Sequence, residues 1–171
     1  MEKVNIIVGR FQPFTNGHLK CIKDVYNKHG LRTVILIIDS KVNDKHPFNK
    51  EILTTMLNKV VHFYGKYCAG FIFVKNADIV LNSESVRNYG YEPISWVCGT
   101  DRYLPYQNMV DKYSLKANLS PNFKLLCVNR TSDDISATSV RNALKMGNYG
   151  VFKTNVPHCL HNMENVFIKN V

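Results

Sequence analysis

Residues 9–18 of the chain read Gly-Arg-Phe-Gln-Pro-Phe-Thr-Asn-Gly-His and directly follow an apolar run over residues 4–8. A short apolar run that ends at a glycine is typical of a buried strand. The residues after the stretch carry apolar side chains at helical spacing, at Leu19, Ile22 and Val25. The stretch is therefore predicted to be the turn between a first strand and a first helix.

The same alternation of apolar runs and helical periodicity continues along the chain. Further strands are predicted at residues 33–38, 71–74, 94–98 and 123–128, and further helices at residues 49–64, 78–88 and 138–146. Residues 101–120 are less regular, and we expect a helix and a mobile loop there. The residues after Phe152 are predicted to form a short helix that caps one edge of the sheet. Short apolar strands separated by helices are typical of an α/β fold, a parallel sheet covered by helices on both faces.

The length of 171 residues fits one domain. We expect a single domain over residues 1–171, with the motif-bearing core at about residues 3–150 and a C-terminal extension over residues 152–171. The five cysteines show no C-x-x-C spacing, and three of them lie in apolar runs. They predict buried thiols rather than a disulfide or zinc framework. Because the N-terminus resembles no signal peptide and no apolar run reaches about 20 residues, we expect a cytoplasmic protein.

The chain is basic, with 22 Lys and Arg against 13 Asp and Glu and a formal net charge of +9. Such an excess favours anionic partners, which include nucleotides, nucleic acids and membrane surfaces. The positive charges are scattered, so a basic but merely solvated surface is an equal alternative. The positive charge agrees with a function in phosphate chemistry but does not distinguish it from the other possibilities.

The turn over residues 9–18 has the features of a phosphate site. Ligands of open α/β sheets bind beyond the carboxyl ends of the strands. Gly9 and Gly17 let the backbone approach a ligand, and the helix start offers amides and a positive dipole end. Thr15 can cap the helix or donate its hydroxyl to a phosphate oxygen, His18 can point its ring at the same anion, and Arg10 adds a permanent charge.

A second helix start late in the chain has the same character. Residues 135–141 read Ile-Ser-Ala-Thr-Ser-Val-Arg. Ser136 and Thr138 can cap the helix, and Arg141 lies one turn in, where it can share a face with Thr138. Taken alone, this is an ordinary helix start; with the first turn, it predicts a second group of anion ligands.

Together these two segments resemble the signature of the nucleotidyltransferase superfamily, which reads His or Thr, any residue, Gly, His, followed later by Ile-Ser-x-Thr-x-x-Arg. The longer string over residues 9–18 is similar to archaeal-type nicotinamide mononucleotide adenylyltransferases, in which the position of Thr15 usually holds His. The resemblance covers about residues 3–150. It implies a single Rossmann-like domain with a parallel five-stranded sheet and helices on both faces.

The resemblance also implies the site residues. It assigns catalytic roles to His18, Thr15 and Arg141. Lys45 falls on a basic position two residues before a Pro-Phe pair, and Gly99 and Asp101 follow the fourth predicted strand, close to where relatives hold adenine or ribose. The full set that the resemblance implies for nucleotide binding is Gly9, Arg10, Phe11, Gln12, Gly17, Lys45, Gly99, Asp101, Ser136 and Thr138.

The reaction implied is transfer of a nucleoside monophosphate, AMP from ATP, to a phosphate-bearing acceptor such as nicotinamide mononucleotide, with release of pyrophosphate. Mg²⁺ is expected to be held mainly by the triphosphate and water, because no carboxylate cluster suggests a protein cage for the metal. Relatives hold the nicotinamide end on a Trp, but Ser85 stands at that position. Trp96, Tyr89 or Tyr103 are the aromatic side chains that can replace it.

Two alternatives stay open at the level of sequence. One is a cytidylyltransferase or another adenylyltransferase of the same superfamily, with CTP or a different small phosphorylated acceptor. The other is an inactive nucleotide- or nucleic-acid-binding module, which the charge permits. Against a decayed site, Gly17, His18, Thr138 and Arg141 are all present. No membrane partner is expected, and the archaeal-type relatives form homo-oligomers, so the resemblance leaves a homo-oligomer open.

Overall fold

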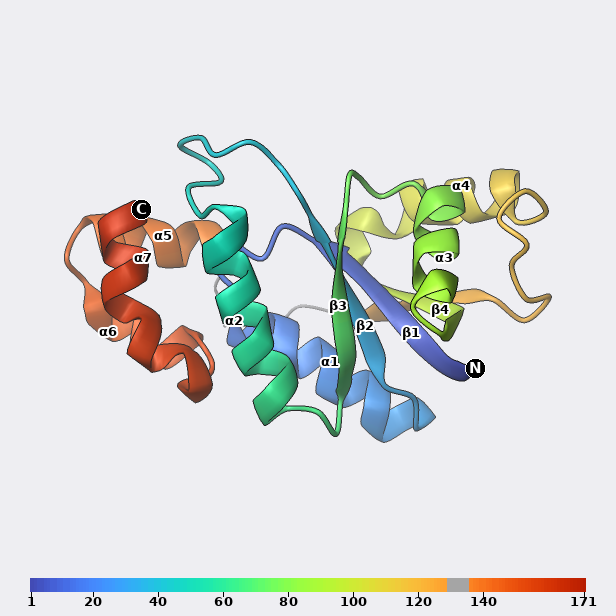
Figure 1. Cartoon of the computed structure of the whole chain (residues 1–171), viewed down its shortest axis with the longest axis horizontal. Helices are drawn as coiled ribbons and strands as arrows, with labels where there is room; N and C mark the ends of the chain where they lie inside the picture. Colours follow the sequence, from blue (N-terminus) through green and yellow to red (C-terminus); the bar gives the residue numbers. More distant parts are fainter. Residues whose placement is uncertain (129–135) are drawn as a thin grey trace.

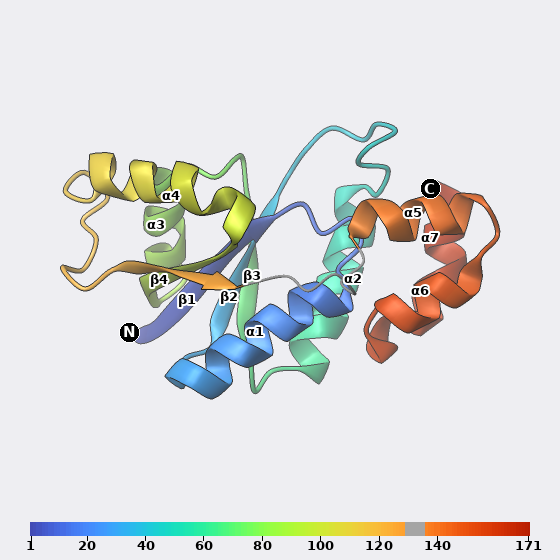
Figure 2. The same ribbon diagram turned by 180° about the vertical axis from the view of Figure 1, so that it is seen from behind.

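A parallel five-stranded sheet forms the centre of the molecule, as the alternation of strands and helices predicts (Figures 1 and 2). The computed structural model describes residues 1–128 and 136–171, so Ile135 of the second motif lies outside the described residues. The strands occur in the order β3-β2-β1-β4-β5. Their bounds are β1 (Glu2–Gly9), β2 (Thr33–Ile38), β3 (Cys68–Val74), β4 (Tyr91–Gly99) and β5 (Lys124–Val128).

The predicted strand β2 has the same bounds in the structure, whereas β4 begins earlier than predicted. Its first residues include Glu92 and Pro93, which break the apolar pattern that the sequence offers. They join the sheet because Tyr91–Pro93 lies in register with residues 2–4 of β1. Strand pairing, not local hydropathy, therefore sets the start of β4.

Helices cover both faces of the sheet, which confirms the predicted layers. Alternate residues of β2 enter opposite clusters: Ile35 and Ile37 pack on one side, Val34 and Leu36 on the other. The first face carries α1 (Asn16–His29), α2 (Lys50–Phe63) and α5 (Ala137–Lys145). The second face carries α3 (Ile79–Asn88) and α4 (Thr100–Tyr113), so the helix expected within residues 101–120 is confirmed.

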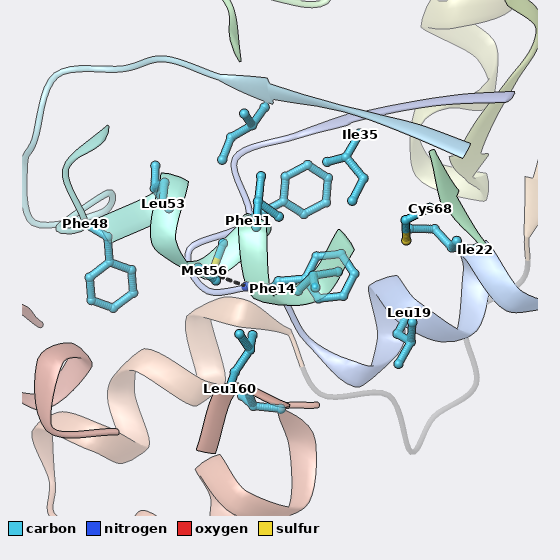
Figure 3. Close-up of a cluster of buried hydrophobic side chains, with 14 of the residues drawn as sticks. Phe11, Phe14, Leu19, Ile22, Ile35, Phe48, Leu53, Met56, Cys68 and Leu160 are labelled. Carbon is cyan, nitrogen blue, oxygen red and sulfur yellow. Dashed lines mark hydrogen bonds between the residues drawn. The ribbon is translucent and has the colours of Figure 1, made fainter. Parts of the chain in front are cut away.

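The C-terminal segment differs from its prediction. It forms α6 (Tyr149–Asn155), the 3₁₀ helix η1 (His158–Met163) and α7 (Glu164–Asn170), which pack against α2 and α5 rather than cap an edge of the sheet (Figure 1). Phe152, Leu160 and Phe167 are fully buried in the cluster of the first face. The rings of Phe48 and Phe167 have centroids 4.8 Å apart, and Figure 3 shows Leu160 below Phe14 and Met56. These residues complete the hydrophobic core.

The expected burial of the cysteines is only partly right. Cys68 and Cys98 are buried, but Cys127 is exposed although it lies in an apolar run. The reason is its place on β5, the last strand of the sheet, which packs against another strand on one side only. Within residues 1–128 and 136–171, no helix is long and apolar enough to cross a membrane.

Candidate functional site

A cleft of about 560 Å³ opens at the carboxyl ends of the central strands. The chain runs from β1 outward to β3 on one side and continues with β4 and β5 on the other, so the order of the strands reverses between β1 and β4. Ligands of open α/β sheets bind at this reversal. Polar and charged side chains that line the cleft come from the β1–α1 turn, the first turn of α1, the β3–α3 turn and the first half of α4: Arg10, His18, Lys75, Asn76, Asp101, Arg102 and Tyr106.

The β1–α1 turn is organised around the ring of Phe11. This residue has a φ of 51°, in the left-handed region, and its side chain is buried. A Cβ at position 9 would lie 3.1 Å from that ring. Packing against Phe11 therefore favours a glycine here, in addition to the predicted close approach of a ligand. The ring of Phe11 also meets the ring of His18 edge-on, with centroids 4.8 Å apart. Phe11 thereby fixes one side of His18.

Thr15 holds the other side of His18. Its backbone N–H donates to Nδ1 of His18 at 2.9 Å, and its hydroxyl oxygen accepts from the backbone N–H of His18 at 3.4 Å. These two bonds form a capping box at the start of α1, so the predicted cap is confirmed. The Thr15 side chain is only 3% exposed, so its contacts are with His18 rather than with the open cleft. Because Nδ1 accepts a hydrogen bond, the neutral ring carries its proton on Nε2.

Gln12 has a role that the sequence did not predict. Its side chain is 3% exposed and hydrogen-bonds the backbone of Phe48 in both directions. The amide nitrogen Nε2 donates to the Phe48 carbonyl at 3.0 Å, and Oε1 accepts from the Phe48 N–H at 2.9 Å. Gln12 was expected to bind the nucleotide; the structure uses its side chain to join two loops.

Arg141 links the second motif to the first. Its guanidinium Nη1 donates to the backbone carbonyl of Gln12 at 2.7 Å, and Nη2 donates to the Thr138 hydroxyl at 3.3 Å. Thr138 and Arg141 therefore share a helix face, as predicted. Ser136 is the N-cap of α5 and accepts from the Ser139 N–H, whereas Thr138 lies inside the helix and does not cap it.

A histidine that the sequence did not single out lies beside these cations. Burial lowers the pKa of His46, and repulsion by Arg10, Arg141 and Lys45 lowers it further. The four side chains come from three separate segments, and we call them the cationic cluster (Arg10, Lys45, His46 and Arg141). Arg10 also lines the cleft, so the cluster adjoins it. The one sequence signal for His46 is its place between Lys45 and the Pro-Phe pair.

The start of α4 brings a carboxylate to the cleft. Gly99 is the N-cap of α4, and a Cβ on it would lie 2.8 Å from Oδ1 of Asp101, so a side chain at this position would displace the carboxylate. Both residues line the cleft, as do Gly9, Arg10, Phe11 and His18 among the predicted site residues. Lys45 and Arg141 belong instead to the cationic cluster, and Gly17 lies in the first turn of α1.

A family model for cytidylyltransferase-like proteins matches residues 6–143, which include the turn, the cleft residues and Arg141. The chain belongs to the cytidylyltransferase-like family. It is thus a nucleotidyltransferase, and the resemblance to that superfamily is confirmed. No curated protein sequence matches the chain.

Several solved structures share the fold of this chain at low sequence identity. A Vibrio parahaemolyticus protein described as a nicotinate-nucleotide adenylyltransferase is 14% identical, with a TM-score of 0.67 over 99% of this chain and 96% of that one. The Plasmodium falciparum nicotinic acid mononucleotide adenylyltransferase complexed with NaAD is 16% identical, with a TM-score of 0.64 over 99% and 95%. A bifunctional NMN adenylyltransferase/ADP ribose pyrophosphatase from Francisella tularensis, complexed with AMP and a Mn ion, is 19% identical, with a TM-score of 0.62 over 99% and 49%.

Proposed function

We propose that this nucleotidyltransferase transfers AMP from ATP to the phosphate of an acceptor mononucleotide, with a nicotinamide or nicotinic acid mononucleotide as the acceptor. The observation that carries the proposal is the continuity of two regions. The cleft, which holds His18 and Asp101, joins through Arg10 to the cationic cluster. A nucleoside triphosphate has the matching layout, with a neutral nucleoside at one end and a chain of phosphates at the other.

The reaction needs little from the protein beyond placement and charge. An oxygen of the acceptor phosphate attacks the α-phosphorus of ATP, the bond to the bridging oxygen of the β-phosphate breaks, and pyrophosphate leaves. The attacking oxygen is already anionic, so no general base is required. Catalysis then depends on orientation and on donors that meet the developing charge.

His18 is the central donor in this mechanism. Since Nδ1 accepts from the Thr15 backbone, the proposed donor to an α-phosphate oxygen is the Nε2–H of His18. The open amides at the start of α1 add donors and the positive end of a 14-residue helix. Thr15 acts as a positioning residue, since its side chain faces His18.

The far phosphates fit the cationic cluster. Arg141 bonds the carbonyl of Gln12, whose side chain bonds Phe48, two residues after His46. Arg141, Arg10 and Lys45 supply the positive charges, and all three act on His46. Positive charges placed close together repel one another, and repulsion by Arg10, Arg141 and Lys45 contributes to the lowered pKa of His46. The β- and γ-phosphates of ATP supply the opposite charge, and this supports the assignment of Arg141 and Lys45.

In this proposal a divalent metal enters as a partner of the triphosphate. Within residues 1–128 and 136–171, no group of three or more His, Cys, Asp or Glu is placed to hold a metal ion. Mg²⁺ would be held by phosphate oxygens and water, and it would supply positive charge to the leaving pyrophosphate. The Mn ion in the Francisella tularensis structure supports the use of a divalent metal.

The choice of ATP over CTP rests on the neighbours. Their structures hold AMP and NaAD, both adenine nucleotides, whereas the family model bears the cytidylyltransferase name. Pyrophosphate release, measured for ATP and CTP with each acceptor, separates the two. Turnover with CTP alone would replace the proposed donor, and salt-sensitive nucleic-acid binding without any turnover would favour a binding module.

The role of His18 is tested by His18→Ala against a matched control on the same helix. His29 lies exposed at the opposite end of α1, so His29→Ala keeps the helix and leaves the cleft untouched. Loss of one preorganised donor lowers turnover about a hundred-fold to a thousand-fold. We expect this loss for His18→Ala, with an unchanged circular dichroism spectrum, and near-normal turnover for His29→Ala. Equal turnover in the two variants would remove His18 from the reaction.

A further inference from the structure

Two cysteines lie opposite each other on neighbouring strands of the sheet. Strand β4 pairs with β5 in parallel, and the register places Cys98 directly beside Cys127. Neighbouring strands lie about 4.7–4.9 Å apart, which falls within the Cα separation of about 4.4–6.8 Å that a disulfide requires. The other strand pairs of the described residues place no two cysteines in register. The backbone therefore brings this pair of thiols within bonding range.

The two side chains also point to the same side of the sheet. Successive side chains of a strand alternate between the faces, so Cys98 points the same way as Trp96, and Cys127 the same way as Leu125. Trp96 and Leu125 both pack on the second face. Burial, then repulsion by Cys127 and Asp101 and a hydrogen bond with Cys127, raises the pKa of the Cys98 thiol to about 11. The Cys127 side chain thus acts directly on the Cys98 thiol.

The two thiols differ in their access to solvent. Cys127 is exposed, because β5 is the edge strand of the sheet (Figure 2). Cys98 is 7% exposed and lines the cleft, and the next residue, Gly99, is the N-cap of α4. A reagent in solution therefore meets Cys127 first, and a bond between the two sulfurs transmits its effect to the wall of the cleft.

We propose that Cys98 and Cys127 form a dithiol modification site whose substrate is a low-molecular-weight disulfide. The thiolate of Cys127 attacks one sulfur of this disulfide, a mixed disulfide forms, and one small thiolate leaves and takes a proton from water. Cys98 then loses its proton to solvent and attacks the Cys127 sulfur, and the second small thiolate leaves and is protonated. Two protein thiols are oxidised to one cross-strand disulfide, and the small disulfide is reduced to two thiols.

The cross-link acts on the nucleotide site through the end of β4. Cys98 directly precedes Gly99, where even a Cβ would lie 2.8 Å from Oδ1 of Asp101, so this part of the cleft wall has little room for movement. Because displacement of site residues by about 1 Å can lower turnover about a hundred-fold, we expect the oxidised protein to turn over about ten-fold more slowly or less. This effect on turnover rests on the proposed function, whereas formation of the disulfide does not.

Peptide mapping tests the site in the full chain. The protein is incubated with oxidised glutathione, the remaining thiols are blocked with N-ethylmaleimide, and the sample is digested with trypsin without reduction. Cleavage after Lys and Arg leaves the two cysteines in separate peptides, residues 88–102 and 125–130. We expect these two peptides to be joined by a disulfide that dithiothreitol breaks. Absence of the joined peptide, or a glutathione adduct that persists on residues 125–130, would overturn the proposal.

Variants assign the two steps. Cys127→Ser should prevent the cross-link, whereas Cys98→Ser should stop the reaction at the mixed disulfide on Cys127. Cys159→Ser is the matched control, since Cys159 is a partly exposed cysteine on η1, and it should form the cross-link like the parent. A cross-link lost in Cys159→Ser, or an unchanged glutathione adduct pattern in Cys127→Ser, would contradict the assignment.

The consequence for the cleft is measured by pyrophosphate release before and after oxidation. We expect oxidation to slow turnover in the parent and in Cys159→Ser, but not in Cys127→Ser, and dithiothreitol to restore it. Equal losses in the parent and in Cys127→Ser would show that the cross-link does not act on the cleft. If the reduced parent turns over no acceptor, the proposed function is wrong, and the joined peptide still decides whether the dithiol site exists.

Discussion

Gln12 provides the sharpest test of how the site is built, because its side chain joins two loops by two buried hydrogen bonds. In Gln12→Ala both partners on Phe48, the N–H and the carbonyl, lose their bonds. Phe48 is 1% exposed, so water does not readily replace them. A buried polar group left without a partner costs about 1–3 kcal/mol, so the two together should lower the free energy of unfolding by about 3 kcal/mol.

The measurement is urea denaturation together with thermal unfolding. For a protein of this size, about 3 kcal/mol corresponds to a fall of about 6–12 °C in Tm. Gln12→Met removes both hydrogen bonds but nearly keeps the side-chain volume, so it should lose almost as much stability as Gln12→Ala. The matched control is Gln107→Ala, since Gln107 makes only an exposed bond to Asp111, and it should stay within about 0.5 kcal/mol of the parent.

A kinetic consequence should accompany the loss of stability. The Gln12–Phe48 bonds hold the loop that carries Lys45 and His46 beside Arg141, so Gln12→Ala should raise the KM for ATP more than it changes kcat. If Gln12→Ala unfolds like Gln107→Ala, the two hydrogen bonds do not hold the loops together. If stability falls but the KM for ATP does not move, the loop is held but does not take part in binding.

Two further predictions concern the cationic cluster. Arg141→Ala should raise the KM for ATP about ten-fold or more, since hydrogen bonds to charged groups contribute about 1.5–3 kcal/mol; an unchanged KM in steady-state kinetics would remove Arg141 from the site. The pKa of His46 lies below its ordinary 6.5 in the free protein, and a bound triphosphate should raise it, so binding takes up a proton and affinity rises as the pH falls. The ligand-free protein should show the opposite trend and lose stability as the pH falls below about 6.5, because the unfolded chain binds this proton first. Calorimetry of a non-hydrolysable ATP analogue in two buffers of different ionisation enthalpy measures the uptake, and uptake that persists in His46→Gln would assign it to another group.

Much of the fold could be predicted because the relevant information is local. Continuous apolar runs indicate which strands are buried on both faces, and β2 has the predicted bounds. Thr15 caps α1 as its position before the helix suggests. Turn, cap and helix spacing depend on residues a few positions apart, so the β1–α1 turn and the start of α5 could be recognised from the sequence alone.

Errors arose where the structure depends on distant partners. The start of β4 is set by pairing with β1, and the exposure of Cys127 by the place of β5 at the edge of the sheet. The C-terminal residues enter the core because α2 and α5 offer an apolar face to them. The local sequence pattern of these residues does not show which elements they pack against.

The sequence by itself therefore determined the family, the α/β layers and the location of the two segments, around His18 and Arg141, that we propose bind phosphate. Only the tertiary structure decided how they work together: Arg141 reaches the carbonyl of Gln12 across 129 positions, and His46 joins the cations through the Gln12–Phe48 contact. It also decided that Tyr106, not Trp96, faces the cleft. The physical reason is that periodicity encodes how deeply a residue is buried, whereas the partner it meets is set by the order of the strands and the packing of helices upon them.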